Sequence, residues 1–363
     1  MENQQRYIRQ MILPGFGVAA QEKLGRAKVL IVGMGALGCP ALQYLVGAGV
    51  GNIGIIDSDL VSESNLHRQL LYGYADIGKP KVAVAAALMR LQNPAIQITT
   101  YQTSFERKNA LDLLEGYDIV IDATDNFIAK YIINDAAGIL NIPMIYGAVT
   151  RYQGQLTVFH FPDQNNLKFN YRDLFPVPPA DHLMGTCESL GVIGVLPGII
   201  GCLQAAEAIK LITDIGKTLA GRLYTHDFLE ATNYEIALSK NSSISMIKKE
   251  DFLKPNHTSS EELEEIDIEE INVDQFLALK KNDQIFVLDV RERHEYPPID
   301  FSDALIPMSE LSNQIEQLPN KEICVICHQG IRSIYAAQQI QARKSIKAYS
   351  LKGGITAYFN KLS

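Results

Sequence analysis

The sequence predicts an α/β protein with two domains, the larger built on a mostly parallel sheet flanked by helices. Short apolar runs alternate with helix-like segments through residues 28–213, and strands that alternate with helices are typical of parallel sheets. A polar, acidic stretch follows near residue 250. A second strand and helix alternation lies beyond it, and 363 residues suit two domains.

Each element of the first domain follows from the spacing of its apolar residues. An amphipathic segment at 6–12 opens the chain, and buried strands are predicted at 28–33, 52–57, 97–101, 118–122 and 143–146. Helices are predicted at 36–48, 79–91, 129–140 and 198–213. Residues 162–186 contain four prolines and little periodicity, which predicts a long surface connection.

The domain boundaries follow from composition. Residues 1–240 are predicted to form the first domain, 241–270 an acidic polar linker, and 271–363 a small second α/β domain. In the second domain, strands are predicted at 285–290 and 322–327, with a helix at 334–342.

Composition excludes several classes of protein. Apolar residues make up 47% and charged residues 20% of the chain, as in soluble globular proteins. The net charge of −8 argues against nucleic acid as a partner. No unbroken apolar run reaches about 18 residues, so no membrane span is expected. Glycines and Pro197 interrupt the apolar stretch 187–215, which predicts a buried helix there.

Five cysteines are too few, and an odd number, for a disulfide framework, so we expect a cytoplasmic protein. Cys324 and Cys327 form a Cys-x-x-Cys pair without a second such pair. A structural zinc ion needs four ligands, so the cysteine count argues against one.

The first candidate site is a glycine turn after the first strand. Gly33, Gly35 and Gly38 form a Gly-x-Gly-x-x-Gly motif, which is typical of Rossmann-like phosphate-binding turns. Asp57 ends the next strand, where an acid can bind a ribose hydroxyl. Nicotinamide or flavin dehydrogenases are the commoner owners of this motif, so it does not decide the chemistry.

Charged residues near the turn favour ATP. Arg68 and Lys81 could clamp phosphates, and Asp125, after the strand at 118–122, could hold Mg²⁺. A dehydrogenase has no need of a triphosphate clamp with a metal. Fixed cations aimed at a crowded phosphorus centre supply catalysis without a nucleophilic side chain.

An ordered set of motifs through residues 5–240 resembles the ubiquitin-activating-like adenylyltransferases, of the molybdopterin-synthase and thiamine sulfur-carrier types. The motifs are Arg6-Tyr-x-Arg9-Gln, the glycine turn, Asp57-x-Asp59, Ser64-Asn65-Leu-x-Arg68-Gln69, Gly78-Lys-Pro-Lys81 and Thr124-Asp125-Asn126. The resemblance implies that ATP adenylates the C-terminal Gly-Gly carboxylate of a ubiquitin-like sulfur-carrier protein, with release of pyrophosphate.

The resemblance also implies roles for single residues. Asp57 would bind ribose, Arg68 and Lys81 the phosphates, and Asp125 the Mg²⁺ ion. The same pocket would contain Asp59, Asn65 and Gln69. Arg9 would reach across a homodimer into the partner's ATP site.

Cys187 follows the proline-rich connection and is similar to a loop cysteine of the family that joins the carrier covalently in some members. A buried structural role is the alternative, because a lone cysteine is most often a small buried hydrophobe. Many relatives also hold zinc with two Cys-x-x-Cys pairs. Here the corresponding segments, 170–173 and 239–243, contain no cysteine, so zinc is predicted to be absent.

The second candidate site is the segment Cys327–Ser333, between a predicted strand and a predicted helix. Successive amides in such a loop form an anion-binding nest that favours a nucleophilic thiolate on Cys327. Arg332 lies five residues after Cys327, one fewer than in cysteine phosphatases. The shorter loop favours a sulfur atom over a phosphate group.

Residues 271–363 resemble a single-domain rhodanese. The similar segments are Asp289-Val-Arg291, Cys327-x-x-Gly330-x-Arg332-Ser333 and Leu351-Lys-Gly353-Gly354. The resemblance implies that Cys327 carries a persulfide, charged by a donor such as a cysteine desulfurase or thiosulfate. The segment 297–304 departs from the family pattern, so the flank of the pocket is expected to differ. Cys324 is expected to be a buried strand residue.

The leading hypothesis is therefore an adenylyltransferase with sulfurtransferase activity, which converts the carrier's carboxylate to a thiocarboxylate. Two alternatives stay open at this point: a nicotinamide-dependent redox enzyme with a persulfide-handling tail, and a non-catalytic module that docks a carrier. Asp125, Arg68 and Lys81 argue against the first alternative, and the presence of both Asp125 and Cys327 argues against the second.

Overall fold

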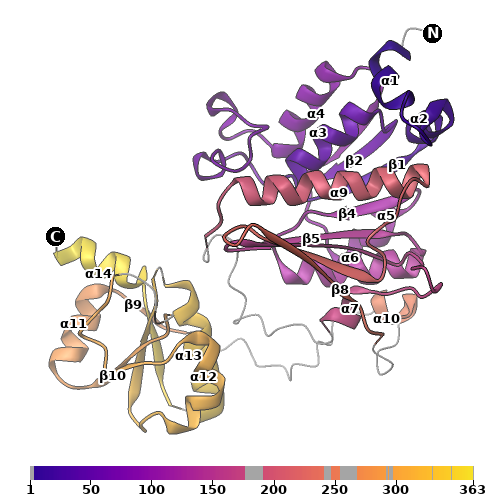
Figure 1. The fold of residues 1–363 in the computed structure, drawn as a ribbon. Coiled ribbons are helices and arrows are strands. Elements are labelled where there is room, and N and C mark those ends of the chain that lie inside the picture. The colour runs from indigo at the N-terminus through magenta and orange to yellow at the C-terminus, as the bar shows by residue number, and fades with distance from the viewer. Residues whose placement is uncertain are drawn as a thin grey trace. The chain divides into compact units, whose positions relative to one another are not determined.

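The computed structural model describes residues 4–175, 191–240, 247–253 and 268–362, apart from 292, 294–296, 329 and 345. They form two compact units, which divide near residue 254 (Figure 1). Each unit has its own sheet and its own buried apolar clusters. Each therefore has the core that a domain needs to fold by itself.

The first unit contains an eight-stranded sheet with the order β3-β2-β1-β4-β5-β6-β7-β8. The first five strands in this order are parallel, and β6, β7 and β8 continue the sheet antiparallel. The strands are β1 (Lys28–Val32), β2 (Asn52–Ile56), β3 (Gln97–Tyr101), β4 (Ile119–Asp122), β5 (Met144–Thr150), β6 (Gln153–Phe159), β7 (Arg222–Asp227) and β8 (Thr232–Ala237). The chain order reverses at β1, which has β2 on one side and β4 on the other. Open α/β sheets bind ligands at such a point.

Helices pack on both faces of this sheet (Figure 1). They are α1 (Gln4–Met11), α2 (Gly17–Arg26), α3 (Gly38–Ala48), α4 (Lys81–Gln92), α5 (Arg107–Leu114), α6 (Phe127–Leu140), α7 (Tyr171–Leu174), α9 (Val195–Thr213) and α10 (Lys249–Leu253), with 3-10 turns η1 (Glu63–Asn65) and η2 (Tyr74–Asp76). Val29 and Ile31 of β1 pack with α2, α3, α4 and α9. Leu30 and Val32 pack on the opposite face with α5 and α6. Burial of side chains of this size stabilises the fold by roughly 1.5–3 kcal/mol each.

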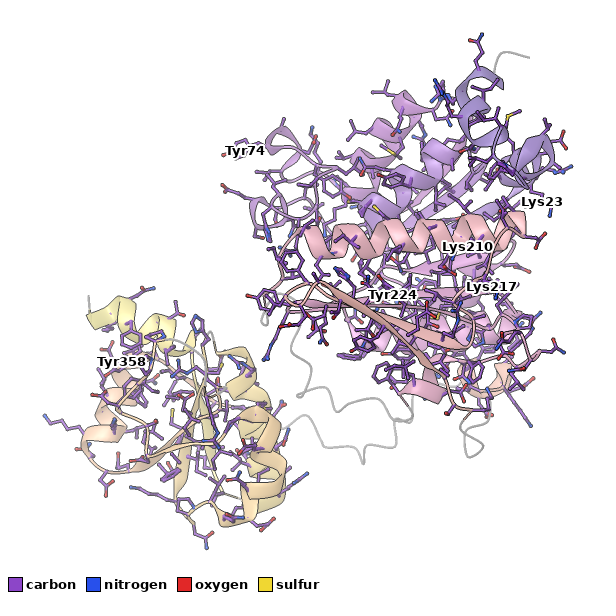
Figure 2. The ribbon with its side chains drawn as sticks, viewed as in Figure 1. Lys23, Tyr74, Lys210, Lys217, Tyr224 and Tyr358 are labelled. Carbon is purple, nitrogen blue, oxygen red and sulfur yellow. The ribbon has the colours of Figure 1, made fainter. Side chains whose placement is uncertain are left out.

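Helix α9 is long and apolar enough by composition to cross a membrane. Its residues Leu196 and Ile200 are fully buried in the core against the sheet. Its C-terminal end is held by polar contacts, because Lys210 Nζ donates to Lys217 O at 2.9 Å and Lys23 of α2 pairs with Asp214 (Figure 2). The interpretation of this segment as a buried helix is therefore confirmed.

The second unit has a five-stranded sheet in the order β11-β10-β12-β13-β9, with parallel pairing throughout. Its elements are β9 (Glu270–Ile271), α11 (Val273–Lys281), β10 (Ile285–Asp289), β11 (Ala304–Leu305), α12 (Met308–Gln314), η4 (Ile315–Gln317), β12 (Glu322–Ile326), α13 (Ile331–Lys344), β13 (Ala348–Leu351) and α14 (Gly354–Leu362). Helices α12 and α13 cover one face of the sheet, and α11 and α14 cover the other. On the second face, Tyr358 of α14 packs on Phe301 with ring centroids 4.2 Å apart (Figure 2).

The antiparallel part of the first sheet was not predicted. The strand expected at 143–146 continues to Thr150 and then pairs with β6. Every residue of β8 is exposed, so this strand contributes no buried side chain to the core. β8 joins the sheet by pairing with β7, and the local sequence pattern does not predict that pairing.

Two expected connections are partly folded. The predicted surface connection 162–186 contains buried residues, because Phe169 and Tyr171 pack in the core and Tyr171 is fully buried. Within the predicted linker 241–270, helix α10 packs on the first unit, with Phe252 fully buried and the Arg107 guanidinium 5.0 Å from its ring centroid. A single helical turn is too short to show helical periodicity. The sequence pattern therefore did not predict α7 in the first connection or α10 in the second.

Candidate functional site

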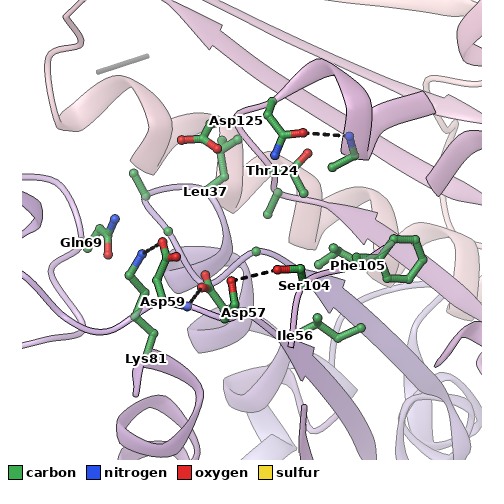
Figure 3. A pocket seen from close by; sticks show the side chains of 18 of the residues that line it. Leu37, Ile56, Asp57, Asp59, Gln69, Lys81, Ser104, Phe105, Thr124 and Asp125 are labelled. Atoms are coloured by element: carbon green, nitrogen blue, oxygen red, sulfur yellow. Dashed lines mark hydrogen bonds and ion pairs between the residues drawn. The ribbon is translucent and has the colours of Figure 1, made fainter. Parts of the chain in front are cut away.

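A cavity of about 460 Å³ opens at the carboxyl ends of β1, β2 and β4 (Figure 3). Its wall contains most residues of the predicted nucleotide site: Gly33, Gly35, Asp57, Asp59, Asn65, Arg68, Gln69, Lys81 and Asp125. The cavity lies where the strand order reverses, which is the usual ligand position in such sheets. The fold therefore brings together side chains from separate loops.

The glycine turn between β1 and α3 has no room for a side chain at Gly33 or Gly38. Gly33 has φ +97°, and a Cβ on it would lie 2.7 Å from Ala123 O. A Cβ on Gly38 would lie 1.9 Å from Gly33 O, so Gly38 allows α3 to start against the turn and does not itself line the cavity. Gly35 is in the wall. Backbone amides at the start of a helix can donate to phosphate oxygens where no side chain blocks the approach.

Asp57 fixes the turn from the neighbouring strand. Its carboxylate accepts hydrogen bonds from Met34 N at 2.7 Å and from Asp59 N at 2.8 Å. Burial raises the pKa of Asp57, and the ammonium group of Lys81 opposes that rise. The Asp57 side chain forms part of the cavity wall, so no described residue of the wall blocks its predicted contact with ribose.

Two cations lie in this wall. Lys81, the first residue of α4, is 5% exposed, and its Nζ is 2.8 Å from Asp59 Oδ2 (Figure 3). Arg68 is half-buried, and its Nη1 donates to Ser64 O at 2.9 Å. Positive charge is thus fixed beside the turn, where preorganised charge can stabilise a phosphoryl transition state.

Asn65 and Gln69 also line the cavity, as the resemblance implies, and both are buried. Asn65 Oδ1 accepts from Ser62 N at 3.4 Å and so shapes the turn η1. A Cβ on Gly35 would lie 3.7 Å from Gln69 Nε2, so the amide nitrogen is beside the glycine turn. Contact of either residue with ATP stays a prediction.

Asp125 is exposed on the loop after β4, and a buried network holds this loop. Asp122 Oδ1 accepts from Thr124 N at 3.0 Å and Thr124 Oγ1 at 2.6 Å. Asp122 Oδ2 pairs with Lys130 Nζ at 3.0 Å, and Lys130 also donates to Thr124 O and Gly147 O, both at 2.9 Å. The network therefore fixes the backbone that presents Asp125.

Sequence reasoning missed two members of this network. Lys130 is a lone lysine in an apolar helix, eight residues after Asp122, and that isolation was a usable signal. Gln204 of α9 is fully buried, and its Nε2 donates to Asp122 O at 2.6 Å. Nothing in the local sequence joins Gln204 to this loop, because the contact depends on how α9 packs.

In the second unit, Cys327 follows β12 and is 1% exposed. Its Sγ accepts a hydrogen bond from Gly330 N at 3.2 Å, so one amide of the predicted cradle is in place. Gly330 has φ +94°, and a Cβ on it would lie 2.9 Å from Gly353 N. Helix α13 starts earlier than predicted, at residue 331, so Arg332 and Ser333 lie in its first turn.

A buried ion pair supports the neighbouring strand of this unit. Arg291 and Asp289 are both almost fully buried, with Nη2 to Oδ2 at 2.8 Å. Arg291 Nη1 also donates to Pro297 O at 2.8 Å. Residues 297–304, whose sequence departs from the rhodanese pattern, are therefore held next to the end of β10 through Pro297.

Neither Cys324 nor Arg9 lines the cavity. Cys324 is fully buried in β12, as expected, and burial raises its pKa to about 12. Arg9 is exposed on α1, away from its own chain's cavity wall. Cys187 lies outside the described residues.

The two segments that correspond to the zinc-binding segments of the resembled family are joined by an ion pair. Lys240 Nζ lies 2.8 Å from Asp173 Oδ2 and donates to Lys168 O at 2.9 Å. The same Asp173 oxygen accepts from Asn170 N and Asn170 Nδ2, each at 2.9 Å. A lysine ammonium group cannot bind zinc, and the described residues contain no group of three His, Cys, Asp or Glu side chains that could hold a metal. These residues do not fit a zinc ion.

The fold and the two sites define a phosphate-binding α/β unit joined to a cysteine-loop unit. The first unit matches the model of the ThiF family over residues 7–245, and residues 272–361 match the Rhodanese-like domain. The chain belongs to the ThiF family and carries a C-terminal Rhodanese-like domain.

Named relatives agree over most of the chain. A sulfur carrier protein adenylyltransferase of Thermus thermophilus is 46% identical over 66% of this chain and 89% of its own length. The probable adenylyltransferase/sulfurtransferase MoeZ of Mycobacterium tuberculosis is 35% identical, over 98% of this chain and 93% of its own. The adenylyltransferase and sulfurtransferase MOCS3 of Arabidopsis thaliana is 35% identical, over 97% of this chain and 82% of its own length.

Solved structures agree with the fold. The crystal structure of Escherichia coli MccB with ATP has a TM-score of 0.56 at 22% identity, covering 63% of this chain and 69% of that one. The crystal structure of PaaA has a TM-score of 0.55 at 23% identity, covering 66% and 75%. At these identities the likeness is one of fold alone.

Proposed function

We propose that the first unit adenylates the C-terminal Gly-Gly carboxylate of a ubiquitin-like sulfur carrier, and that the second unit converts the adenylate to a thiocarboxylate. The observation that carries the proposal is one cavity with a bare glycine turn, a buried lysine, a half-buried arginine and an exposed aspartate. The near full-length similarity to proteins named adenylyltransferase/sulfurtransferase supports it.

The adenylation step needs no nucleophile from the protein. A carboxylate oxygen of the carrier attacks the α-phosphorus of ATP, and the bond to the bridging oxygen breaks as pyrophosphate leaves with the electron pair. Arg68 and Lys81 would stabilise the negative charge that develops, because their positions are set before the reaction. Asp57 would orient the nucleotide through its ribose.

Mg²⁺ would add charge neutralisation at the phosphates when bound, and Asp125 is the residue that would hold it. Mg²⁺ commonly binds one or two protein carboxylates together with substrate phosphates. The exposed position of Asp125 in the cavity wall fits such a partial protein site.

Sulfur transfer would use the persulfide on Cys327. Its outer sulfur attacks the acyl carbon of the adenylate, AMP leaves, and an acyl disulfide forms. A second thiol then attacks Cys327 Sγ, which releases the thiocarboxylate and leaves a disulfide for a cellular thiol to reduce. Cys187 is the candidate for a covalent link to the carrier, as the family resemblance implies. A cysteine desulfurase or thiosulfate would recharge Cys327, and a reducing cytoplasmic location suits this thiol chemistry.

A homodimer is part of the proposal, with Arg9 acting in the partner's ATP site. Support comes from exposed apolar side chains on α1 and directly after it, near Arg9 in the chain. Ile8, Ile12 and Leu13 are 50–67% exposed, and apolar groups clustered on a surface often mark an interface.

The test is pyrophosphate–ATP exchange with purified carriers, followed by intact mass after addition of thiosulfate. We expect exchange that depends on the carrier, and a carrier mass gain that corresponds to one oxygen replaced by sulfur. Nicotinamide reduction without exchange would support a redox enzyme instead. Carrier binding without exchange would support a docking module.

A further inference from the structure

A chain of buried hydroxyl groups lies beneath Cys327. Ser333 Oγ is 3.5 Å from Cys327 Sγ, and Ser350 Oγ of β13 is 2.8 Å from Ser333 Oγ. Both serines are fully buried. Among the described residues, Ser350 is linked to the sulfur only indirectly, most closely through Ser333.

Both serines can donate to the same backbone acceptor. Gly330 O lies 2.8 Å from Ser333 Oγ and 3.3 Å from Ser350 Oγ. Each hydroxyl carries one proton, so each can make one of these bonds at a time. Two of the possible proton arrangements differ in whether Ser333 donates to the sulfur.

In the first arrangement, Ser333 donates to Gly330 O, and Ser350 donates to Ser333 Oγ. This arrangement suits a neutral thiol, which needs no hydroxyl donor. In the second arrangement, Ser333 turns to donate to Cys327 Sγ, and Ser350 donates to Gly330 O. This arrangement suits a thiolate, which then has two donors within the described part of the loop, Ser333 and Gly330 N.

We propose that Ser350 is a positioning residue for sulfur transfer, which takes over the hydrogen bond to Gly330 O and so frees Ser333 to donate to the Cys327 thiolate. Without Ser350, the turn of Ser333 would leave the buried Gly330 O without a hydroxyl donor, which costs hydrogen-bond energy. The inference rests on the proposed persulfide role of Cys327.

Cys327 Sγ is charged at the start of the half-reaction with thiosulfate and at the end of the half-reaction with cyanide. The thiolate attacks the outer sulfur of thiosulfate, and sulfite leaves with the electron pair. Cyanide then attacks the outer sulfur of the persulfide, and the pair from the broken S–S bond returns to Sγ. A donor to Sγ therefore assists both steps.

The test is a double-mutant cycle on the full chain. Ser333→Ala and Ser350→Ala each remove one hydroxyl, so little disturbance of packing is expected. We expect Ser333→Ala to lower thiosulfate:cyanide transfer about tenfold and Ser350→Ala by a smaller factor of about three to ten. In the Ser333→Ala background, Ser350→Ala should have no further effect.

A second readout does not depend on sulfur transfer. The pH at which iodoacetamide modifies Cys327 at half its maximal rate should rise in both single variants. His328, Arg332 and the Asp289–Arg291 pair are unchanged in them and so cannot cause a difference. Thr356→Ala is the matched control, because Thr356 Oγ1 donates to His328 O at 2.9 Å without a link to the sulfur.

Additive losses in the double variant, or an unchanged alkylation profile for Ser350→Ala, would overturn the inference. Absence of thiosulfate turnover in the wild-type protein would instead contradict the proposed role of Cys327. The alkylation profile would still report on Ser350 in that case.

Discussion

Lys130 Nζ lies 3.0 Å from Asp122 Oδ2 in the core of the first unit, with the two side chains 5% and 0% exposed. The pair joins β4 to α6 below the loop that presents Asp125. Lys130 also satisfies the carbonyl oxygens of Thr124 and Gly147. A single ammonium group thus compensates a buried carboxylate and two buried acceptors.

Substitution of Lys130 by methionine should therefore destabilise the protein strongly. Removal of one partner from a buried ion pair costs about 3–5 kcal/mol. Urea unfolding of the full chain would measure this. Lys23→Met, which breaks the exposed pair with Asp214, should cost no more than about 1 kcal/mol. Equal losses in the two variants would contradict the importance assigned to the buried pair.

The sequence predicted the local parts of the site better than the packed ones. The glycine turn and Asp57 belong to one strand–turn–helix–strand unit, so spacing alone placed them together. Lys130 and Gln204 join the site through tertiary packing. Ser350 reaches Ser333 only because β13 pairs with β12, with Ser350 opposite Val325. Such relations depend on strand register, which short-range patterns do not encode.

Lys81 is expected to be essential for adenylation, and its neighbour Lys79 is a matched control. Lys81 lies buried in the cavity wall, whereas the Lys79 side chain is 56% exposed and pairs with Asp76. Lys81→Met should lower carrier-dependent pyrophosphate–ATP exchange by about 100-fold or more, because a preorganised charge is lost. Lys79→Met should keep exchange close to wild type. Comparable rates for both variants would remove Lys81 from the mechanism.

Subunit mixing tests the trans role of Arg9. Arg9→Ala and Asp125→Ala homodimers should each be inactive in exchange. If Arg9 acts in the partner's site, a mixed dimer has one complete site, so random mixing of equal amounts should restore about a quarter of wild-type activity. Sedimentation would establish the dimer first. No recovery in dimers shown to exchange subunits would place Arg9 in its own chain's site or outside both.

The Asp173–Lys240 pair predicts a protein that needs no zinc at this position. Elemental analysis should find no stoichiometric zinc, and a chelator should leave the thermal unfolding midpoint unchanged. Lys240→Met should lower stability by about 1.5–3 kcal/mol, because Asp173 is fully buried and would lose a charged donor. Stoichiometric zinc in the purified protein would refute the prediction.

His160 should make stability depend on pH. Burial lowers the pKa of its imidazole from 6.5 to about 4, and its Nε2 lies 3.0 Å from Asn134 Oδ1. Between these two values the unfolded chain binds more protons than the folded one, so stability is complete above pH 6.5 and falls as the pH drops towards 4. The loss should be about 2 kcal/mol between pH 7 and pH 5. His160→Asn tolerates the left-handed φ of +58° and removes the titrating group. Urea unfolding of both proteins should therefore give free energies that converge as the pH falls, and parallel curves would show that His160 is not the titrating group.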